Sequence, residues 1–246
     1  MPKTLIVIPA RLAASRLPRK PLADIAGRPM IVHVWERAVA ADVGPVVVAC
    51  GEREIADAVE RAGGRAVLTR SDHATGSDRI AEALHRIDAE RSFDKVVNVQ
   101  GDVPTIEPRL ISTAARLLDD TETDIGTLVS EIRDAEEITN PNVVKAAVGF
   151  AAGSRVGRAL YFSRNPIPSG AGPYFHHIGI YAYRREVLER FVTMPPAVLE
   201  QRERLEQLRA LVAGYTITAA LVDTIPLGVD TPADLERARA VLRPGA

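Results

Sequence analysis

The sequence contains a single cysteine, Cys50, among its 246 residues. One cysteine excludes an internal disulfide bond and argues against a metal site built on cysteine thiolates. Long hydrophobic runs are missing as well, because the apolar stretch at 4–8 soon gives way to arginines and no later stretch approaches the ~20 apolar residues of a membrane span. A soluble protein that stays in the reducing cytoplasm is expected.

An excess of charge of one sign is also missing. The 31 lysines and arginines nearly balance the 32 aspartates and glutamates, and the two signs are interleaved along the chain. Nucleic acid and anionic membranes are therefore not expected partners. Neither G-x-G-x-x-G nor GxxxxGK[ST] follows the first apolar run, which counts against a dehydrogenase and a P-loop nucleotidase. No Ser-His-Asp or Cys-His constellation for covalent catalysis is recognisable.

Short apolar runs alternate with longer amphipathic segments in the first half of the chain. Strands are predicted at 4–8, 45–50 and 94–99, and helices at 29–41, 52–62 and 77–91. This alternation is typical of βαβ units with a parallel sheet that is buried on both faces.

After residue 120 the strand candidates follow one another more closely and are joined by turns such as NPN and SGAGP. Strands are predicted at 124–131, 143–149, 157–163, 174–183 and 215–222, and helices at 198–213 and 232–242. The predicted fold class is α/β, a Rossmann-like mixed sheet flanked by helices with an added antiparallel section. One continuous domain is expected because no linker or repeat interrupts the chain.

A basic loop follows the first strand. It contains Arg11, Arg16, Arg19 and Lys20 and no acidic residue before Asp24. In open α/β sheets ligands bind beyond the carboxyl ends of the strands, so this loop is expected to meet the loop from Gln100 and the region 72–79. A solvated surface loop is the alternative for any single arginine, but the cluster favours binding of a polyphosphate by fixed positive charge.

Two aspartates are candidate ligands of a metal ion. Asp102 falls just past the end of an apolar strand, where a turn-forming role is the alternative. Asp230 precedes Thr231 and Pro232, so its spacing alone indicates the N-cap of a helix. Magnesium is usually held by one or two carboxylates together with substrate phosphates, and this pair would suffice if the fold brings the two together.

Two further segments carry polar groups in apolar surroundings. Alternation along 175–185 places His177, Tyr181 and Tyr183 on one face of a strand, where they form either a polyol-binding surface or a core tyrosine pair with a satisfied histidine. In ERLEQLRAL the leucines have helical spacing, and Glu206 and Gln207 are either solvated or functional. Spacing leaves both alternatives open in each segment.

Taken together, the motifs resemble the 3-deoxy-D-manno-octulosonate (Kdo) cytidylyltransferase family. The matching segments, in chain order, are IPARLAASRLPRKPL, MIVHVWERA, TRSDHATGSDR, VNVQGDVP, NPNVVK, ALYFSR, HHIGIYAYR, LEQLR and GVDTPADLERAR. The basic loop also occurs in related sugar nucleotidyltransferases. The combination of VNVQGD, HxGxYxYR and LEQLR is more specific.

The resemblance implies a reaction of CTP with Kdo that gives CMP-Kdo and pyrophosphate, with Mg²⁺, for lipopolysaccharide synthesis. It also implies a cytoplasmic homodimer with a nucleotide-diphospho-sugar transferase-like fold, in which about 1–120 bind CTP and 121–246 bind the sugar and dimerise. The implied roles are phosphate binding for Arg11 and Lys20, magnesium binding for Asp102 and Asp230, nucleotide contacts for Arg70, Ser77 and Gln100, and sugar contacts for Gln100, Arg164, His177, Tyr181, Glu206 and Gln207.

The sequence departs from the family pattern in three places. Arg19 stands where the loop usually has glycine, Val103 stands where some members have glutamate, and the connection at 166–174 is shorter than in some relatives. The open alternatives are a cytidylyltransferase for 8-amino-Kdo or a sialic acid, and a catalytically silent nucleotide-binding regulator. Retention of Lys20 with both aspartates favours the enzyme.

Overall fold

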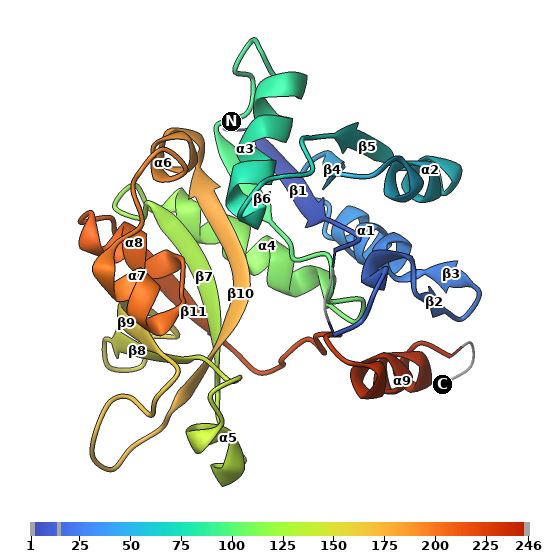
Figure 1. Ribbon diagram of the computed structural model, residues 1–246. Coiled ribbons are helices and arrows are strands. Elements are labelled where there is room, and N and C mark those ends of the chain that lie inside the picture. The colour runs from blue at the N-terminus through green and yellow to red at the C-terminus, as the bar shows by residue number, and fades with distance from the viewer. Residues whose placement is uncertain (1–2, 14–15, 244–246) are drawn as a thin grey trace. The chain divides into compact units, whose positions relative to one another are not determined.

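The computed structural model describes residues 3–13 and 16–243 (Figure 1). The chain forms two compact units. Unit 1 consists of Met1–Ser112 and Pro226–Ala246, and unit 2 of Thr113–Ile225. The C-terminal segment thus belongs to the same unit as the first strand. The prediction of one continuous domain that divides near residue 120 stays a prediction.

Unit 1 is built on parallel strands in the order β5-β4-β1-β6. Ile6 of β1 pairs with Val46 of β4 on one side and Val97 of β6 on the other. The β-branched residues of these strands are buried, as expected for strands covered on both faces. The elements are β1 (Thr4–Ala10), α1 (Met30–Ala40), β4 (Val46–Cys50), α2 (Arg53–Arg61), β5 (Arg65–Leu68), α3 (Gly76–Ile87) and β6 (Lys95–Asn98).

The C-terminal segment returns to unit 1 as α9 (Pro232–Val241). It lies next to a small ribbon of β2 (Asp24–Ile25) and β3 (Arg28–Pro29), which follows the 3₁₀ helix η1 (Lys20–Leu22) (Figure 1). Ile25 and Met30 pack there against Val229, Leu235 and Ala238 in a buried apolar core. This core anchors the segment that carries Asp230.

Unit 2 has a mixed sheet in the order β10-β7-β11-β9-β8. The β7–β11 pair is parallel, the other neighbouring pairs are antiparallel, and His176 of β10 also pairs with Lys145 of β8. The strands are β7 (Ile125–Glu131), β8 (Lys145–Phe150), β9 (Val156–Ser163), β10 (Phe175–Arg184) and β11 (Ile217–Val222). The helices are η2 (Leu117–Asp119), α5 (Ala135–Thr139), α6 (Arg185–Phe191), α7 (Val198–Glu203) and α8 (Gln207–Val212), while α4 (Pro108–Arg116) leads from unit 1 into unit 2.

The predicted α/β class is confirmed, with parallel pairing in unit 1 and mixed pairing in unit 2. The single helix predicted at 198–213 is wrong. Arg204 adopts a left-handed conformation (φ 56°, ψ 47°) and ends α7, and the amide of Leu205 donates to the carbonyl of Glu200. Two helices, α7 and α8, result.

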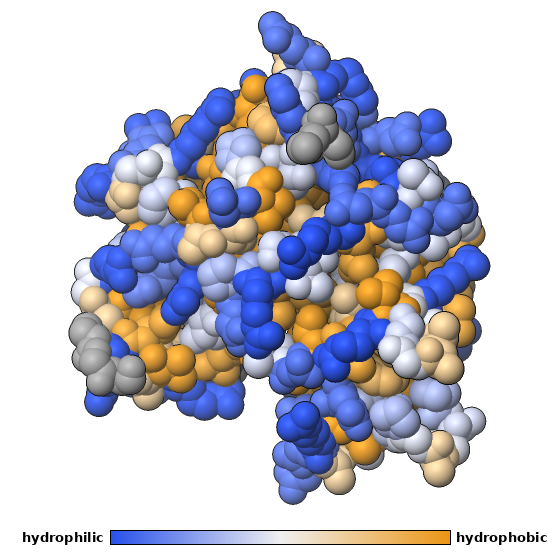
Figure 2. All heavy atoms as spheres, turned by 180° about the vertical axis from the view of Figure 1, so that it is seen from behind, coloured by the Kyte–Doolittle hydropathy of each residue, from blue (hydrophilic) through white to orange (hydrophobic). Residues whose placement is uncertain are grey.

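Surface composition agrees with the balanced charge of the sequence. On the face shown in Figure 2, hydrophilic side chains alternate with smaller apolar areas. Large exposed apolar residues include Val39 and Val241 in unit 1 and Leu160, Val198 and Val212 in unit 2. Within 3–13 and 16–243, none of the helices combines the length and the hydropathy that a membrane crossing requires.

Candidate functional site

A cavity of about 360 Å³ lies in unit 1 where the basic loop meets the loops that follow β5 and β6. The three segments expected to converge therefore do so. Positive charge dominates its wall, which includes Arg11, Arg16, Lys20 and Arg79 together with Asp102 and Asp230 and the polar residues His73, Thr75 and Gln100. The N-terminus of α3 also borders the cavity, and its backbone N–H groups favour an anion.

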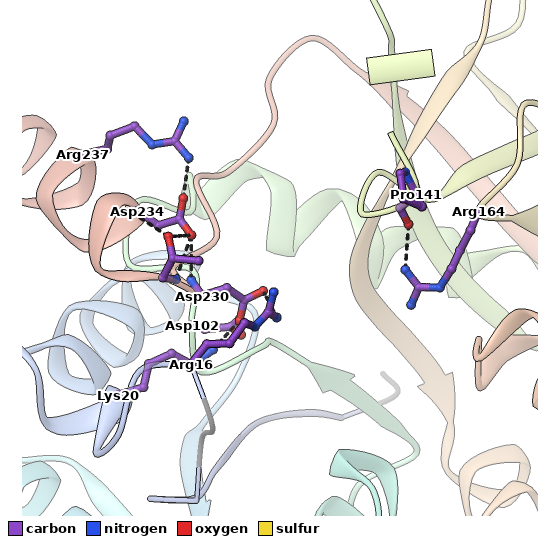
Figure 3. A network of polar contacts seen from close by, with 9 residues as sticks. Arg16, Lys20, Asp102, Pro141, Arg164, Asp230, Asp234 and Arg237 are labelled. Carbon is purple, nitrogen blue, oxygen red and sulfur yellow. Dashed lines mark hydrogen bonds and ion pairs between the residues drawn. The ribbon is translucent and has the colours of Figure 1, made fainter. Parts of the chain in front are cut away.

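Lys20 connects the two candidate metal ligands. Its Nζ donates to Asp102 Oδ2 at 2.8 Å and to Asp230 Oδ1 at 2.9 Å, and Arg16 Nη2 lies 3.2 Å from Asp230 Oδ2 (Figure 3). Burial alone would lower the pKa of Lys20, but the charges and hydrogen bonds of the two carboxylates outweigh it and raise the pKa. The ammonium is therefore charged at neutral pH and holds both aspartates at one point.

The backbone explains how two carboxylates far apart in sequence meet. The amide of Val229 donates to the carbonyl of Asp102 at 2.9 Å, which places the next residue, Asp230, beside it. Thr231, and not Asp230, is the N-cap of α9, because its hydroxyl accepts from the amide of Asp234 and the Asp234 carboxylate accepts from the amide of Thr231. The N-cap reading of Asp230 is wrong, and its carboxylate is free to face Lys20.

Close approach of the loops also requires a glycine at residue 101. A Cβ on Gly101 would lie 2.7 Å from the carbonyl oxygen of Pro9, closer than such atoms can pack. Any larger residue would push the loop after β6 away from the end of β1, and Asp102 would move with it. The glycine of the QGD motif is thus explained by packing at the cavity wall.

The geometry fits a divalent cation held by two carboxylates. One nitrogen lies within hydrogen-bond distance of Asp102 and Asp230 at the same time, so a single cation can be shared by both. No cluster of three or more His, Cys, Asp and Glu residues occurs in the described part of the chain. This pair matches the donor set of Mg²⁺, which commonly takes its remaining ligands from water and substrate phosphates.

Arg79 is a residue of this cavity whose importance was not apparent from the sequence. Its side chain is 2% exposed, and Nη1 donates to Thr69 Oγ1 at 2.6 Å and to the carbonyl of Arg70 at 3.0 Å. Burial lowers the pKa of Arg79, and no partner for Nη2 lies among the described residues. The GSDR motif contained the only available signal, an arginine one turn into a helix.

Of the remaining residues predicted to contact the nucleotide, one lines the cavity and two do not. Gln100 lines the cavity and its Nε2 donates to Asn98 Oδ1 at 3.2 Å. Arg70 is exposed and makes a bidentate pair with Asp72, with distances of 2.9 and 2.8 Å. Ser77 is buried in the first turn of α3. Neither Arg70 nor Ser77 is among the residues that line the cavity, and their nucleotide contacts stay predictions.

All candidate sugar residues except Gln100 belong to unit 2, where a row of rings forms what we call the aromatic cluster. The cluster comprises Phe162, His177, Tyr181, Tyr183 and Phe191, with neighbouring centroids 4.8 to 6.2 Å apart. The predicted common face of His177, Tyr181 and Tyr183 is therefore confirmed. Burial lowers the pKa of His177 to about 3 and raises that of Tyr181. Both side chains are neutral at pH 7.

Two polar groups of unit 2, one of them in the aromatic cluster, form no hydrogen bond with the described residues. They are the hydroxyl of Tyr181 and the amide of Gln207, which is 7% exposed at the start of α8. Glu206 acts electrostatically on Tyr181 and lies 3.8 Å from Arg209. The solvated-helix alternative is therefore wrong for Gln207, which is buried.

Positive charge without a carboxylate partner completes the unit 2 site. Arg164 donates to the carbonyl of Pro141 at 2.9 Å (Figure 3) and to that of Glu203 at 3.1 Å. Lys145 is completely buried and donates to the carbonyls of Asn140 and Val143, while burial and the charge of Arg164 lower its pKa. In the part of the chain that the structure describes, both side chains donate to backbone carbonyls and neither pairs with an acid.

Comparison with known proteins relates the chain to cytidylyltransferases. Residues 5–217 match the family model described as cytidylyltransferase. The 3-deoxy-manno-octulosonate cytidylyltransferase of Paramagnetospirillum magneticum is 62% identical over 97% of both chains, and that of Rhodospirillum centenum is 65% identical over 98% of this chain and 93% of its own. A CMP:2-keto-3-deoxy-manno-octonic acid synthetase complexed with CTP is 43% identical, with a TM-score of 0.90 over 98% of both chains. A cytidylyltransferase from Leptospira borgpetersenii, 16% identical with a TM-score of 0.62 over 98% of this chain and 86% of its own, shares the fold.

Proposed function

The chain belongs to the cytidylyltransferase family, and on this premise we propose that it transfers CMP from CTP to the anomeric hydroxyl of Kdo and releases pyrophosphate. The observation that carries the proposal is the contact of Lys20 with both Asp102 and Asp230 inside a cavity lined by further cations. This arrangement suits a nucleoside triphosphate bound with a divalent cation. A site for binding alone would not need the paired carboxylates.

The mechanism follows from charge and position. Attack of the anomeric hydroxyl on the α-phosphate breaks the bond to the β-phosphate, and negative charge grows on the phosphate oxygens and on the departing pyrophosphate. Arg11 and Lys20 stabilise that charge from the basic loop. The hydroxyl proton passes to solvent as the new bond forms. No covalent enzyme intermediate is required.

Asp102 and Asp230 are the residues that would hold Mg²⁺. When bound, Mg²⁺ supplies Lewis-acid stabilisation of phosphate charge and lowers the pKa of the attacking hydroxyl. Lys20 neutralises the aspartates in the structure described here, and its ammonium is mobile enough on its four-carbon stem to turn toward a phosphate instead. Lys20 thus keeps the two carboxylates together before the nucleotide and its cation arrive.

The acceptor is an acidic sugar in this proposal. Kdo carries a carboxylate, and the unpaired charges of Arg164 and Lys145 favour such a group over a neutral sugar. The hydroxyl of Tyr181 and the amide of Gln207 offer hydrogen bonds to the polyol, next to the aromatic cluster. Glu206, Gln100 and the neutral ring of His177 complete the set of sugar contacts that we propose.

The cellular setting is proposed with the reaction. CMP-Kdo is an activated sugar for lipopolysaccharide assembly, and its synthesis is placed in the cytoplasm with soluble CTP. A homodimer is included, because Leu160, Val198 and Val212 of unit 2 expose apolar side chains at 60%, 71% and 57%. Size-exclusion chromatography with light scattering tests the dimer separately from the activity.

The experiment is a pyrophosphate-release assay of the purified protein with Mg²⁺ and CTP. Kdo, 8-amino-Kdo and N-acetylneuraminate are supplied in parallel, and ATP, GTP and UTP replace CTP in matched reactions. Release with CTP and Kdo that EDTA abolishes and Mg²⁺ restores is the expected result. Pyrophosphate release only with another acidic sugar would leave the reaction as proposed and assign that sugar as the acceptor. A folded protein that binds CTP but releases nothing with any acceptor would favour the regulatory alternative.

A further inference from the structure

The hydroxyl of Thr127 lies at the centre of a polar contact in unit 2 that no sequence motif marks. Thr127 is on β7 and is completely buried. Its Oγ1 is 3.0 Å from Nε2 of His177, 2.8 Å from the carbonyl oxygen of Ile180 and 3.3 Å from that of Ile178. One hydroxyl therefore meets one ring nitrogen and two carbonyl oxygens.

An irregularity of β10 creates this arrangement. Ile178 pairs with Leu128 and Tyr181 pairs with Thr127, so Gly179 and Ile180 have no counterpart on β7. Such a bulge disrupts the hydrogen-bond ladder and leaves backbone groups that need another partner. The hydroxyl of Thr127 serves as the missing donor for the bulge. The same hydroxyl also contacts the ring of His177, which precedes the bulge.

The tautomer of His177 follows from the hydrogens available for the contacts of the Thr127 hydroxyl. Carbonyl oxygens only accept, and a threonine hydroxyl carries one hydrogen. If that hydrogen goes to the closer carbonyl, of Ile180, the contact with Nε2 requires a hydrogen on Nε2. The opposite choice, donation from Thr127 to Nε2, would withdraw the donor from both buried carbonyls at a cost typical of unsatisfied polar groups.

The charged form of the ring is excluded separately. His177 lies between Phe162 and Tyr181, and burial lowers its pKa to about 3, so the ring is neutral at pH 7. With hydrogen on Nε2, the other nitrogen, Nδ1, is an acceptor. Nδ1 has no hydrogen-bond partner within residues 3–13 and 16–243, and the residue keeps 8% of its surface exposed.

We propose that Thr127 is a positioning residue that holds His177 as the Nε2–H tautomer, so that Nδ1 accepts a hydrogen bond from a hydroxyl group of the acceptor sugar. This inference rests on the proposed function, because it assigns His177 to the sugar. It adds to that function that His177 acts toward the sugar only as a hydrogen-bond acceptor. Because Nδ1 can only accept a hydrogen bond, the site favours a sugar with a hydroxyl group at this position over an analogue that lacks it.

The test compares two substitutions of Thr127 in the full-length protein. Thr127→Val has nearly the same shape and removes the hydroxyl, while Thr127→Ser keeps it. Thr123→Val is the matched control, since Thr123 is equally buried and its hydroxyl contacts Thr218 and not His177. Long-range ¹H–¹⁵N correlation spectra of ¹⁵N-histidine-labelled protein at pH 7 report which ring nitrogen of His177 carries hydrogen, before and after addition of Kdo.

We expect Nε2–H in the wild type, in Thr127→Ser and in Thr123→Val, with a change of the Nδ1 resonance when Kdo is added. Thr127→Val is expected to lose the single tautomer and to show a KM for Kdo that is about tenfold higher, with the KM for CTP unchanged, as loss of one directed hydrogen bond requires. Thr127→Ser restores both properties.

Two results would overturn the inference. One is an Nδ1–H or charged His177 in the wild type at pH 7, whatever the activity. The other is a Thr127→Val protein that has lost the Nε2–H tautomer but has an unchanged KM for Kdo. A wild type with the expected tautomer that neither binds Kdo nor releases pyrophosphate would instead overturn the proposed function and, with it, the assignment of Nδ1 to a sugar hydroxyl.

Discussion

The cavity of unit 1, which we assign to the nucleotide, and the aromatic cluster of unit 2, which we assign to the sugar, present their polar groups in opposite ways. The cavity presents charges on loops, and the side chains of Arg16 and Asp230 are 61% and 52% exposed. The aromatic cluster lies on β9, β10 and α6 and is largely buried, with a neutral histidine and tyrosine. Phosphate chemistry needs charge where negative charge develops, whereas a polyol is recognised by hydrogen bonds of fixed direction.

Because of this difference, substitutions at the two sites are expected to change the stability of the protein by different amounts. Ion pairs that remain partly in water contribute about 0–1 kcal/mol each, so the charges of unit 1 can be removed at little cost to folding. The polar groups of unit 2 are buried, and loss of one partner leaves another unsatisfied at a cost of about 1–3 kcal/mol. Substitutions of the partly exposed charges of the cavity are therefore expected to affect activity alone, and those of the buried polar groups of unit 2 to affect activity and stability together.

The largest effect is expected for Asp102→Ala. Removal of this carboxylate takes away half of the cation site and should lower kcat roughly 1,000-fold, as for loss of a principal electrostatic group. Its ion pair with Lys20 is partly exposed, so the urea midpoint should change little. Asp24→Ala, an exposed aspartate of unit 1 outside the cavity, is the control. Near-normal turnover of Asp102→Ala at saturating Mg²⁺ would remove Asp102 from the metal site.

A smaller effect, confined to one substrate, is expected for Arg164→Lys. Lysine keeps the charge but lacks the planar fork that contacts the carbonyls of Pro141 and Glu203. The KM for Kdo should rise about tenfold or more, with the KM for CTP unchanged. Arg158→Lys, on the exposed side of β9, should leave both constants as they are. Equal changes in the two KM values would show that Arg164 supports the fold and not the sugar.

The pH dependence of stability should differ between the units. His177 is neutral when folded, and its pKa rises from about 3 to the ordinary 6.5 when the chain unfolds. Below pH 6.5 the unfolded state binds a proton that the folded state does not. The free energy of unfolding therefore decreases as the pH is lowered, by about 2 kcal/mol from pH 7 to pH 5. In unit 1 the Asp234 carboxyl, with its pKa lowered from 3.8 to about 2, contributes stability that is lost only below about pH 4.

Hydrogen exchange with mass-spectrometric readout at pH 7, 6 and 5, corrected for the intrinsic exchange rate, measures this difference. Peptides from β10 should lose protection before peptides from β1. In global urea unfolding, His177→Asn should reduce the pH slope over the same range. Equal loss of protection in β1 and β10, or an unchanged slope for His177→Asn, would contradict the assignment.

Much of unit 1 could be predicted from the sequence, because its determinants are local. Apolar runs without polar interruption specify β1, β4 and β6, and the loops that follow them carry the charged motifs. The edge strand β5 was missed, since its residues are exposed or half-buried and give no apolar run. The meeting of Asp102 with Asp230 depends on a backbone contact between distant segments, and spacing alone indicated an N-cap for Asp230.

The site in unit 2 was harder to predict for physical reasons. A histidine and two tyrosines on one strand face fit a core as well as a ligand site, and the hydrogen-bond partner of the histidine is Thr127 on another strand, which the pattern of β10 does not reveal. Gln207 lies on a helix whose start depends on the left-handed Arg204, which helical periodicity does not reveal. Lys145 gave no signal because a buried lysine that contacts only carbonyl oxygens has no motif of its own.

The smallest effect is expected for Arg19→Gly in the basic loop. Arg19 stands where the family usually has glycine, and its backbone is left-handed (φ 58°, ψ 26°), a conformation that costs a side chain about 1 kcal/mol. Glycine would relieve that strain but would be more flexible when unfolded, and the variant would lose an exposed ion pair with Glu54. Because these contributions oppose one another, the free energy of unfolding should change by less than about 1 kcal/mol.

Activity distinguishes the two roles left for Arg19. Its side chain is 58% exposed and turns to Glu54, and Arg19 does not line the cavity that contains Lys20 and Arg11. A retained KM for CTP in Arg19→Gly therefore means that the loop needs only the left-handed turn. Arg11→Ala, measured beside it, should raise that KM at least tenfold through loss of a phosphate contact. A comparable rise of the KM for CTP in Arg19→Gly would show that the Arg19 side chain leaves Glu54 and binds phosphate. A residue outside the cavity lining would then contribute to nucleotide binding.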